Sequence, residues 1–538
     1  MGREGAERIR NTLETRRTIG LFGGRLGALF LISLPLQGQV PSPQPEVADI
    51  TIRVGNVFSA EEVAQHGRIP YGLANALHTT TRPAFIQQAL LFRIGDPIDP
   101  AILDETERNL RAFRLFRSVR VSAQEGHVLV QANDAWTLIP RGTLGQKGGV
   151  LTYSVGVEER NLFGTGRQLA FRYDRGAERL TRSFTFIDPH VWLPYTTFQL
   201  TAEDLSDGRT IQVGLTRPFY ALHAPNSGSL LYRNALFDAT LYRGGEVESI
   251  WKKRERRALG EAGLRVFAES DAVWRLVASA EWSDIQLAPE GAGAAPPEAP
   301  RRFLFVGLAL EREGRRWLKL RNVNRIDRDE DFSLAPAGRF QLEGSPRVFG
   351  ASAAIRLRGE ISAGQTLPWG LAGFALASGA GETRMQDGPR QTRLTADLRT
   401  YALLRRITIA ARIGASLGWR RDPEERVELD GLSGLRAYRI HAVSGSRRLV
   451  GNLEARTRLV SDILNLVSLG AAAFVDDGFS WGAPDRFVHL TDVGAGLRIG
   501  LTRASSNDLI RIDVARGLRP DPLGRAGWLV SFSSGQAF

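Results

Sequence analysis

Residue types that could carry out covalent or metal chemistry are present in this sequence, but their spacing does not support such chemistry. The seven histidines never pair at metal-ligand spacing, and the absence of cysteine removes thiolate zinc sites, catalytic thiols and disulfides. Asp327, Asp329 and Asp331 follow a calcium-loop pattern only until Phe332 takes the position that needs glycine. Motifs that pair a nucleophile with a base are also missing. The sequence therefore predicts no enzyme, no metal and no cofactor.

Charged residues instead alternate with apolar ones in many short segments. Glu454 lies between Leu453 and Ala455, and successive side chains of a strand point to opposite faces, so Glu454 should face a wet interior. In the following segment Asp476 has the parity of Ser468 and is predicted to face the same interior. Charge on one face of consecutive strands is costly in a sandwich core but suits a water-filled barrel lumen.

Bulk composition excludes two other classes of protein. No run of eighteen or more apolar residues is present, so a helical membrane protein is not expected. The formal charge of +12 could suggest nucleic-acid binding, but only four residues are lysine and the arginines are scattered, usually with an acidic residue nearby. We therefore expect no nucleic-acid partner.

The first residues are typical of a secretory signal. Arg16, Arg17 and Arg25 precede the apolar stretch Leu26–Leu36, which is too short to span a bilayer. We predict a signal peptide over residues 1–38 and a Pro- and Gln-rich linker over 39–47. A disordered apolar tail is the alternative interpretation.

Residues 48–138 are predicted to form a small α+β domain. The segment begins with an alternating strand, continues with helices and ends with two short strands. Asp99 is a suitable N-cap with Pro100 at the first helical position, and Leu103 and Leu110 recur at helical spacing. The expected order is strand, helices, strand, strand.

Residues 148–538 carry an all-β pattern of short alternating segments separated by Gly, Pro, Asp and Asn. We predict a mainly β fold, with a transmembrane antiparallel β-barrel following the α+β domain. About 24 residues for each strand with its loop give about 16 strands, a common size for such barrels. More alternating segments occur between 205 and 400, and some of these are expected to be hairpins outside the membrane.

The small domain resembles a known periplasmic module. Residues 91–121, which read LFRIGDPIDPAILDETERNLRAFRLFRSVRV, look like a POTRA domain of the BamA/TamA outer-membrane assembly superfamily. The resemblance implies a periplasmic domain that binds partners by adding a strand to a free sheet edge. Only one such domain fits in this chain.

The barrel region resembles the same superfamily, in its bacterial surface antigen type, at two places. The first is a turn between two early strands, formed by Asn161, Leu162, Phe163, Gly164 and Gly166. The second is an inward-folded loop at 428–446, tipped in that family by Val-Arg-Gly-aromatic and here by Leu435, Arg436, Ala437 and Tyr438. The resemblance implies that Arg436 reaches Glu454 and Asp476 on the inner wall. Alanine in place of glycine at 437 argues against a left-handed backbone there.

The resemblance also implies a lateral seam where the first and last strands of the barrel meet. We expect residues around 148–157 to pair with 527–538, which end in an amphipathic strand and a terminal phenylalanine. Glycines weaken packing in strands, so the seam should be the weak point. The seam residues expected from the sequence are Gly148, Gly149, Gly156, Phe532, Gly535 and Phe538.

These features together predict an outer-membrane protein with its small domain in the periplasm. The function implied by the resemblance is insertion of client β-barrel proteins through the seam. The expected partners are unfolded outer-membrane or secreted clients, membrane lipid and periplasmic chaperones or accessory proteins. The alternatives are a secretion pore that passes a partner protein through the lumen, a passive porin, and an outer-membrane hydrolase.

Overall fold

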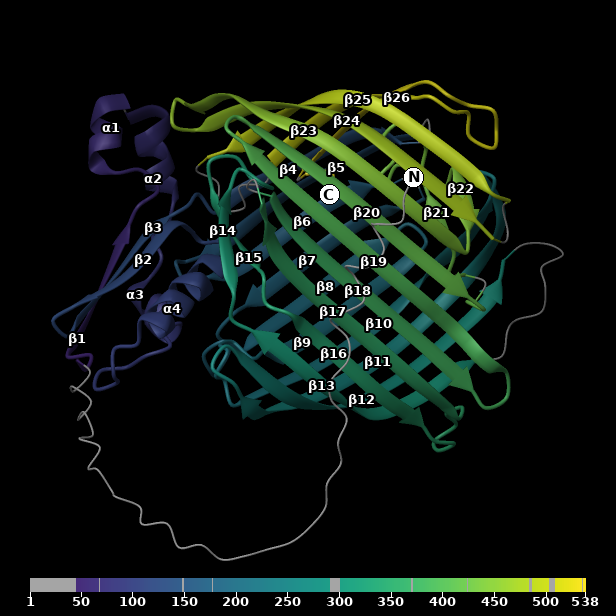
Figure 1. The fold of residues 1–538 in the computed structure, drawn as a ribbon, viewed down its shortest axis with the longest axis horizontal. Helices are drawn as coiled ribbons and strands as arrows, with labels where there is room; N and C mark the ends of the chain where they lie inside the picture. Colours follow the sequence, from purple (N-terminus) through teal and green to yellow (C-terminus); the bar gives the residue numbers. More distant parts are fainter. Residues whose placement is uncertain are drawn as a thin grey trace, which may run out of the picture. The chain divides into compact units, whose positions relative to one another are not determined.

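A computed structural model gives the structure of the chain (Figure 1). The expected signal peptide, 1–38, and the first part of the expected linker, 39–47, lie outside the described residues. The structure describes residues 45–538 except 67, 148–149, 177, 291–299, 369–370, 423, 483–485, 503–508 and 535.

The α+β domain has the element order expected from the sequence. Its three strands form one sheet in the order β1-β3-β2, with β1 parallel to β3 and β2 antiparallel to it. A short π-helical turn, η1, joins two of the helices. The elements are β1 (Asp49–Gly55), α1 (Ala60–His66), η1 (Arg68–Gly72), α2 (Leu73–Leu77), α3 (Pro83–Gln88), α4 (Pro100–Ala112), β2 (Phe116–Gln124) and β3 (His127–Asp134).

Helix α4 begins and packs as its sequence dictates. The Asp99 carboxylate accepts the backbone N–H of Ala101 at 2.8 Å, and Pro100 occupies the first helical position, where no N–H partner is needed. Leu103 and Leu110 are buried in the core between the helices and the sheet. The helix is thereby held on one face of the sheet.

In the part of the chain that the structure describes, twenty strands form a closed antiparallel barrel, more than the expected number of about 16. The estimate of 24 residues per strand was too long because several turns are very short, such as Gly244–Gly245. The barrel strands are β4 (Leu138–Lys147), β5 (Val150–Leu162), β6 (Arg167–Arg175), β7 (Leu180–Asp188), β8 (Thr197–Leu205), β9 (Gly208–Arg217), β10 (Asn226–Arg243), β11 (Glu246–Ala268), β12 (Ala272–Pro289), β13 (Arg301–Gly314), β16 (Ala337–Ser345), β17 (Ala354–Leu367), β18 (Leu371–Arg384), β19 (Gly388–Leu404), β20 (Ile407–Trp419), β23 (Arg447–Ile463), β24 (Val467–Trp481), β25 (Val488–Leu501), β26 (Leu509–Gly517) and β27 (Trp528–Ser534).

The expected hairpins between 205 and 400 are mostly part of the barrel itself. Among the described residues of that range, only the hairpin of β14 (Trp317–Arg321) and β15 (Asp329–Ser333) stands outside the closed sheet. It belongs to the connection 315–336 between β13 and β16, which we call the strap.

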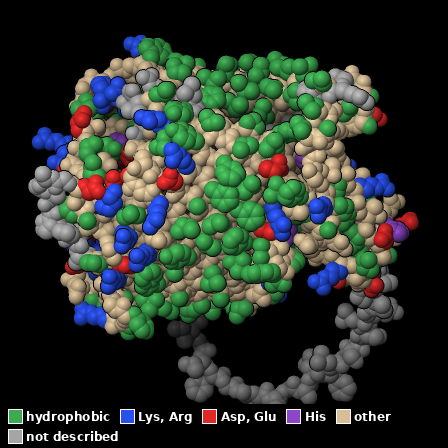
Figure 2. Space-filling view, turned by 180° about the vertical axis from the view of Figure 1, so that it is seen from behind, with side chains coloured by type: hydrophobic (Ala, Val, Ile, Leu, Met, Phe, Trp, Pro, Cys, Tyr) green, Lys and Arg blue, Asp and Glu red, His purple; other side chains and the backbone are tan. Residues whose placement is uncertain are grey.

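The two faces of the barrel wall differ as the alternation predicts. On β23, Leu449 and Leu453 are exposed on the outer face while Glu454 is buried on the lumenal face. Hydrophobic side chains cover much of the outer wall seen in Figure 2. In the described part of the chain, no helix is long and apolar enough to cross a membrane.

The barrel begins ten residues earlier than the sequence indicated, at Leu138 rather than 148. The segment Leu138–Lys147 reads like a linker because of Pro140 and its glycines, yet it pairs along its full length with β5. Proline is tolerated in an edge-like strand, and β4 is such a strand because, among the described residues, its other side pairs with β27 at one position. The α+β domain therefore ends before Leu138.

The turn between β5 and β6 fixes the domain to the barrel. Asn161 donates to the Thr81 hydroxyl at 2.9 Å, and the Gly164 carbonyl accepts the N–H of Arg82 at 2.8 Å. Gly166 has a φ of 71°, and a Cβ there would lie 2.3 Å from the Phe85 ring. Glycine is required at this position both by the backbone and by the close approach of the domain.

Candidate functional site in the lumen and at the seam

The connection between β20 and β23 folds into the barrel, and we call its residues 424–446 the lumen loop. A two-stranded pairing of β21 (Val427–Leu429) with β22 (Val443–Gly445) closes its base. At its turn Asp430 accepts the backbone N–H groups of Leu432, Ser433 and His441 at 2.9 to 3.0 Å. These bonds give the loop tip one conformation.

Arg436 at the loop tip lies between the two acidic residues that parity placed in the lumen. Its Nε and Nη2 donate to both oxygens of Asp476 at 2.7 and 2.9 Å, and Nη1 donates to Glu454 at 2.6 Å. The guanidinium carbon lies 3.3 Å from the centre of the Phe474 ring. All three charged side chains are buried. The structure thus brings the predicted residues together, in a fork geometry that lysine cannot reproduce.

The network extends to charged residues that the sequence analysis did not assign to a site. Glu454 also accepts from Arg456 at 3.0 Å and from Arg498 at 2.9 Å, and Arg498 donates to Asp513 at 2.6 Å. Arg498 and Asp513 alternate with apolar neighbours, so the same parity could have found them. These ion pairs fix the position of Arg436, and with it the loop tip, on the lumenal wall.

Tyr438 and Ala437 complete the contact of the loop with the wall. The Tyr438 hydroxyl lies 2.8 Å from the carbonyl oxygens of Thr491 and Arg519. Ala437 donates its N–H to Asp492 at 3.2 Å. The left-handed backbone occurs three residues earlier, at Gly434 with a φ of 122°, and Ala437 does not have a positive φ. Alanine is therefore compatible with the inward fold of this loop.

His441 attaches the lumen loop to the opposite side of the barrel. Its Nδ1 lies 2.5 Å from Glu428 and its Nε2 lies 2.8 Å from Glu178 in the β6–β7 turn, while its ring stacks on Tyr242 at 3.9 Å. Burial lowers the pKa of His441, but the bonds to the two carboxylates outweigh burial and raise the pKa to about 10. Nothing in the local sequence indicated this contact, because its partners are distant in the chain.

The same histidine belongs to the one group of described residues whose spacing could hold a metal. Ligand atoms of Glu428, Asp430 and His441 lie within 4.8 Å of one another. However, both ring nitrogens of His441 already contact carboxylates, and Asp430 is engaged by backbone N–H groups. The arrangement is an ion-paired attachment of the loop.

The strap reaches the same lumenal wall from the end of the barrel where the α+β domain lies. Arg456 donates to the Val323 carbonyl at 2.9 Å, and Asp327 accepts from Arg458 at 2.5 Å. On its other side Asp331 accepts from Arg111 of α4 at 2.9 Å. The strap therefore connects the domain to the strand that carries Glu454.

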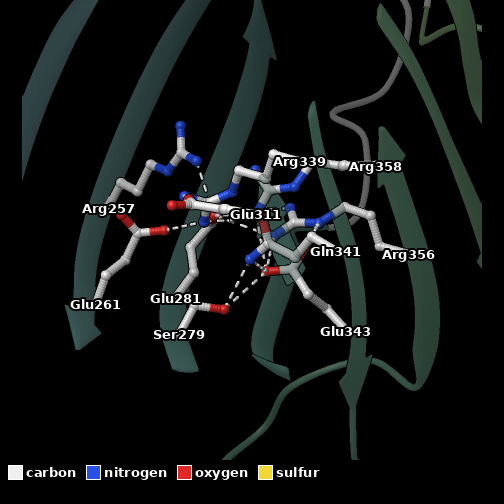
Figure 3. Close-up of polar contacts among 10 residues, drawn as sticks. All are labelled: Arg257, Glu261, Ser279, Glu281, Glu311, Arg339, Gln341, Glu343, Arg356 and Arg358. Carbon is white, nitrogen blue, oxygen red and sulfur yellow. Dashed lines mark hydrogen bonds and ion pairs between the residues drawn. The ribbon is translucent and has the colours of Figure 1, made fainter. Parts of the chain in front are cut away.

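A second group of lumenal charges, the far-wall cluster, lies about halfway around the strand order from the β27–β4 junction (Figure 3). Glu343 accepts from Arg356 at 2.7 Å and from Arg358 at 2.8 Å, and Arg356 also reaches Glu281 at 3.0 Å. These bonds tie β16 to its neighbour β17 and link β17 to β12, which lies on the other side of β13. The cluster consists of Arg257, Glu261, Ser279, Glu281, Glu311, Arg339, Gln341, Glu343, Arg356 and Arg358.

The barrel closes where β27 meets β4, and we call this junction the seam. Among the described residues the two strands pair at a single position, Ser531 opposite Gly145. On its other side β27 pairs with β26 along its whole length. The expected partner segment 148–157 is wrong, since it belongs largely to β5, where Gly156 pairs with Arg141 and Arg172. Gly148 and Gly149 lie outside the described residues.

The end of the chain also differs from the expectation. Trp528 and Val530 are exposed on the outer face, and Phe532 shares their parity. The strand stops at Ser534, and Gly535 lies outside the described residues. Phe538 is buried in a cluster with Val323, Tyr401 and Ala410 instead of continuing the strand.

Phe538 turns inward because the lumen offers it more contact than the seam does. The Arg456 guanidinium lies 5.1 Å from its ring centre, and the strap contributes Val323 to its surroundings. Continuing the register of Ser531 and Gly145 would have placed Phe538 opposite Leu138. The edge of β4 near Leu138 is consequently left without this partner.

Comparisons with known proteins identify similar solved structures. No protein-family model and no curated protein matches the sequence. CdiB from Acinetobacter baumannii is similar over 91% of this chain and 73% of its own, with 14% identity and a TM-score of 0.44. CdiB from Escherichia coli is similar over 94% of this chain and 93% of its own, with 10% identity and a TM-score of 0.46. BamA from Haemophilus ducreyi lacking POTRA domains 1–3 is similar over 90% of this chain and 85% of its own, with 10% identity and a TM-score of 0.40.

Proposed function

We propose that this chain is an outer-membrane barrel of the BamA/TamA type that assembles client β-barrel proteins at its seam, without covalent chemistry. The observation that carries the proposal is the single described pairing between β27 and β4, because every other pair of neighbouring barrel strands is paired at seven or more described positions. A closed barrel has no free strand edge, so it can template a client strand only where one junction is weak. The exposed edge would pair with a client by backbone hydrogen bonds.

The geometry at the seam supports entry of a client strand into the seam from the end of the barrel where the α+β domain lies. β27 stops at Ser534, so around Leu138 the part of β4 nearest the domain has no described strand partner, and the Leu138 carbonyl instead accepts from the Trp136 indole N–H. In the domain, β1 and β2 are the outer strands of the sheet and each pairs only with β3 among the described residues. An unfolded client, alone or with a periplasmic chaperone, would bind such an edge before reaching β4.

The ion-paired loop and strap in the lumen favour release of the client through the barrel wall over transport through the lumen. The lumen loop is held by Arg436 and the strap by Arg456, and both contacts converge on Glu454. Separating a buried ion pair costs about 3–5 kcal/mol, so a secretion pore or passive porin would first have to break this network.

A disulfide across the seam tests the proposal. The chain has no cysteine, so Gly145→Cys with Ser531→Cys gives one defined cross-link. Val514→Cys with Val530→Cys is the matched control, because these residues lie opposite each other on the fully paired strands β26 and β27. The readout is the heat-modifiable gel shift of a small outer-membrane barrel assembled in vesicles containing the variant.

We expect oxidation to abolish assembly in the seam variant, reduction to restore it, and the control to stay active under both conditions. Undiminished assembly by the oxidised seam variant would show that the seam does not act. Transport of an unfolded protein across the vesicle by that same locked variant would favour the secretion pore instead.

A further inference from the structure

The segment that joins α1 to α3 carries large apolar side chains on its surface. Leu73 and Leu77 lie one helical turn apart on α2 and are 52% and 65% exposed, and Ile69, just before α2, is 79% exposed. Isolated apolar residues are common on protein surfaces, but three on one short segment point to a covering partner.

The opposite side of this segment is firmly fixed to the rest of the molecule. The Tyr71 hydroxyl donates to the Leu464 carbonyl at 2.6 Å, and its ring packs edge-on against Phe58 at 4.9 Å. The Asn75 side chain bonds both the N–H and the carbonyl of Phe58, at 3.1 and 2.9 Å. These contacts leave Leu73 and Leu77 directed away from the core, so their exposure does not come from a loose segment.

The apolar surface of the segment continues that of the barrel wall. Leu464 lies in the β23–β24 turn that Tyr71 contacts and is 68% exposed. Leu459 and Val460, which precede the turn on β23, are also exposed. Trp136, two residues before the seam strand β4, packs near Ala74 of α2 in the same cluster. The outer wall, the β23–β24 turn and α2 therefore adjoin one another, and Trp136 links them to the start of β4.

We propose that Ile69, Leu73 and Leu77 form a membrane anchor, which inserts into the headgroup–acyl boundary of the leaflet on the domain side of the barrel. Continuity with the outer face of β23 favours lipid as the occupant over a protein partner. A short amphipathic segment lying in the interface plane gains from exactly this burial of apolar side chains. The inference rests on the proposed outer-membrane location, and it would hold the α+β domain beside the open edge of β4.

Fluorescence quenching by lipid tests the anchor. Because the chain lacks cysteine, Leu73→Cys and Leu77→Cys in the full-length protein can each carry one environment-sensitive fluorophore. The labelled proteins are reconstituted in phosphatidylcholine–phosphatidylglycerol vesicles with and without brominated acyl chains. Glu125→Cys, in the exposed β2–β3 turn, is the control for the domain, and Leu453→Cys, on the outer face of β23, is the reference for insertion of the barrel.

We expect brominated lipid to reduce the emission at positions 73, 77 and 453 about twofold or more, and to leave position 125 unchanged. Quenching at 453 with none at 73 and 77 would overturn the anchor while leaving the membrane barrel intact. A blue shift at 73 and 77 that grows with the protein-to-lipid ratio, without quenching, would assign the surface to a second copy and also overturn it. Absence of quenching at 453 would contradict the proposed location itself.

Discussion

The seam and the far wall are built from the same kind of strand, yet they are joined very differently. At the far wall β12 and β13 pair at every residue from Ala272 to Ile285, and β16 and β17 pair from Ala337 to Ser345. Their lumenal side chains add the ion pairs of the far-wall cluster (Figure 3). At the seam one backbone pairing is described. Backbone pairing and ion pairing between strands are therefore unevenly distributed around the barrel.

This difference indicates where the barrel can deform. Backbone pairings act together, so a strand junction with many of them opens far less often than one with few. The charges at the far wall add side-chain links between strands that already pair at seven or more positions with each neighbour. Under the proposed function, opening would be confined to the seam, where the described strand pairing is sparsest.

The largest expected effect comes from breaking the far-wall cluster. Glu343→Ala removes the buried carboxylate that Arg356 and Arg358 share, and should lower the free energy of unfolding by about 3–5 kcal/mol. Glu360→Ala, at an exposed position on β17, should change it by less than about 0.5 kcal/mol. Urea unfolding followed by tryptophan fluorescence measures both. Equal stability of the two variants would mean that the cluster does not reinforce this wall.

Removing the contact of the lumen loop with the barrel wall is expected to have the next largest effect. Arg436→Ala should cost about 3 kcal/mol, because Asp476 would remain buried without its cation while Glu454 keeps Arg456. Arg436→Lys should recover only part of this loss, since lysine cannot bond both carboxylates in fork geometry. The matched control is Arg182→Ala, whose ion pair with Asp204 is exposed. The readout is the temperature at which the folded barrel shifts its mobility on a gel. If Arg436→Ala shifted at the wild-type temperature, the contact of Arg436 with Asp476 would not stabilise the barrel.

Hydrogen exchange compares the seam with the far wall directly. We expect amides of Trp528–Ser534 to exchange about 100-fold faster than those of Leu276–Trp282 in β12, a difference of about 3 kcal/mol in opening free energy. The measurement is mass spectrometry of peptides from the unmodified protein in vesicles. Similar protection of the two segments would remove the basis for a weak seam.

The smallest effect concerns pH and the attachment of the lumen loop by His441. The pKa of His441 is raised from 6.5 to about 10, so its ion pairs contribute fully below pH 6.5 and are lost as the pH rises towards 10. The group is partly exposed, so the loss should be about 1 kcal/mol. Trypsin cleavage of the loop should increase over this range relative to His441→Gln, which lacks the titrating group. If both proteins showed the same pH dependence of cleavage, a group other than His441 would be responsible for it.

Local alternation was sufficient to predict the lumenal residues but not the closure of the barrel. Glu454 and Asp476 could be placed because parity along one strand decides which face a side chain takes. The seam could not, because strand pairing joins residues such as Gly145 and Ser531 that are far apart in the sequence. The first barrel strand was missed for a local reason, since Pro140 is unusual in a fully paired strand. The inward turn of Phe538 depends on the strap and had no signal in its own segment.

The strap also constrains the order in which the chain can fold. Its Val323 meets Tyr401, Arg456 and Phe538, so the strap can settle only after the second half of the barrel and the last residue are in place. Contacts between residues so distant in the sequence slow folding, because a long chain must be ordered before they form. The nascent barrel would therefore keep its lumen open at the domain end until Phe538 is in place.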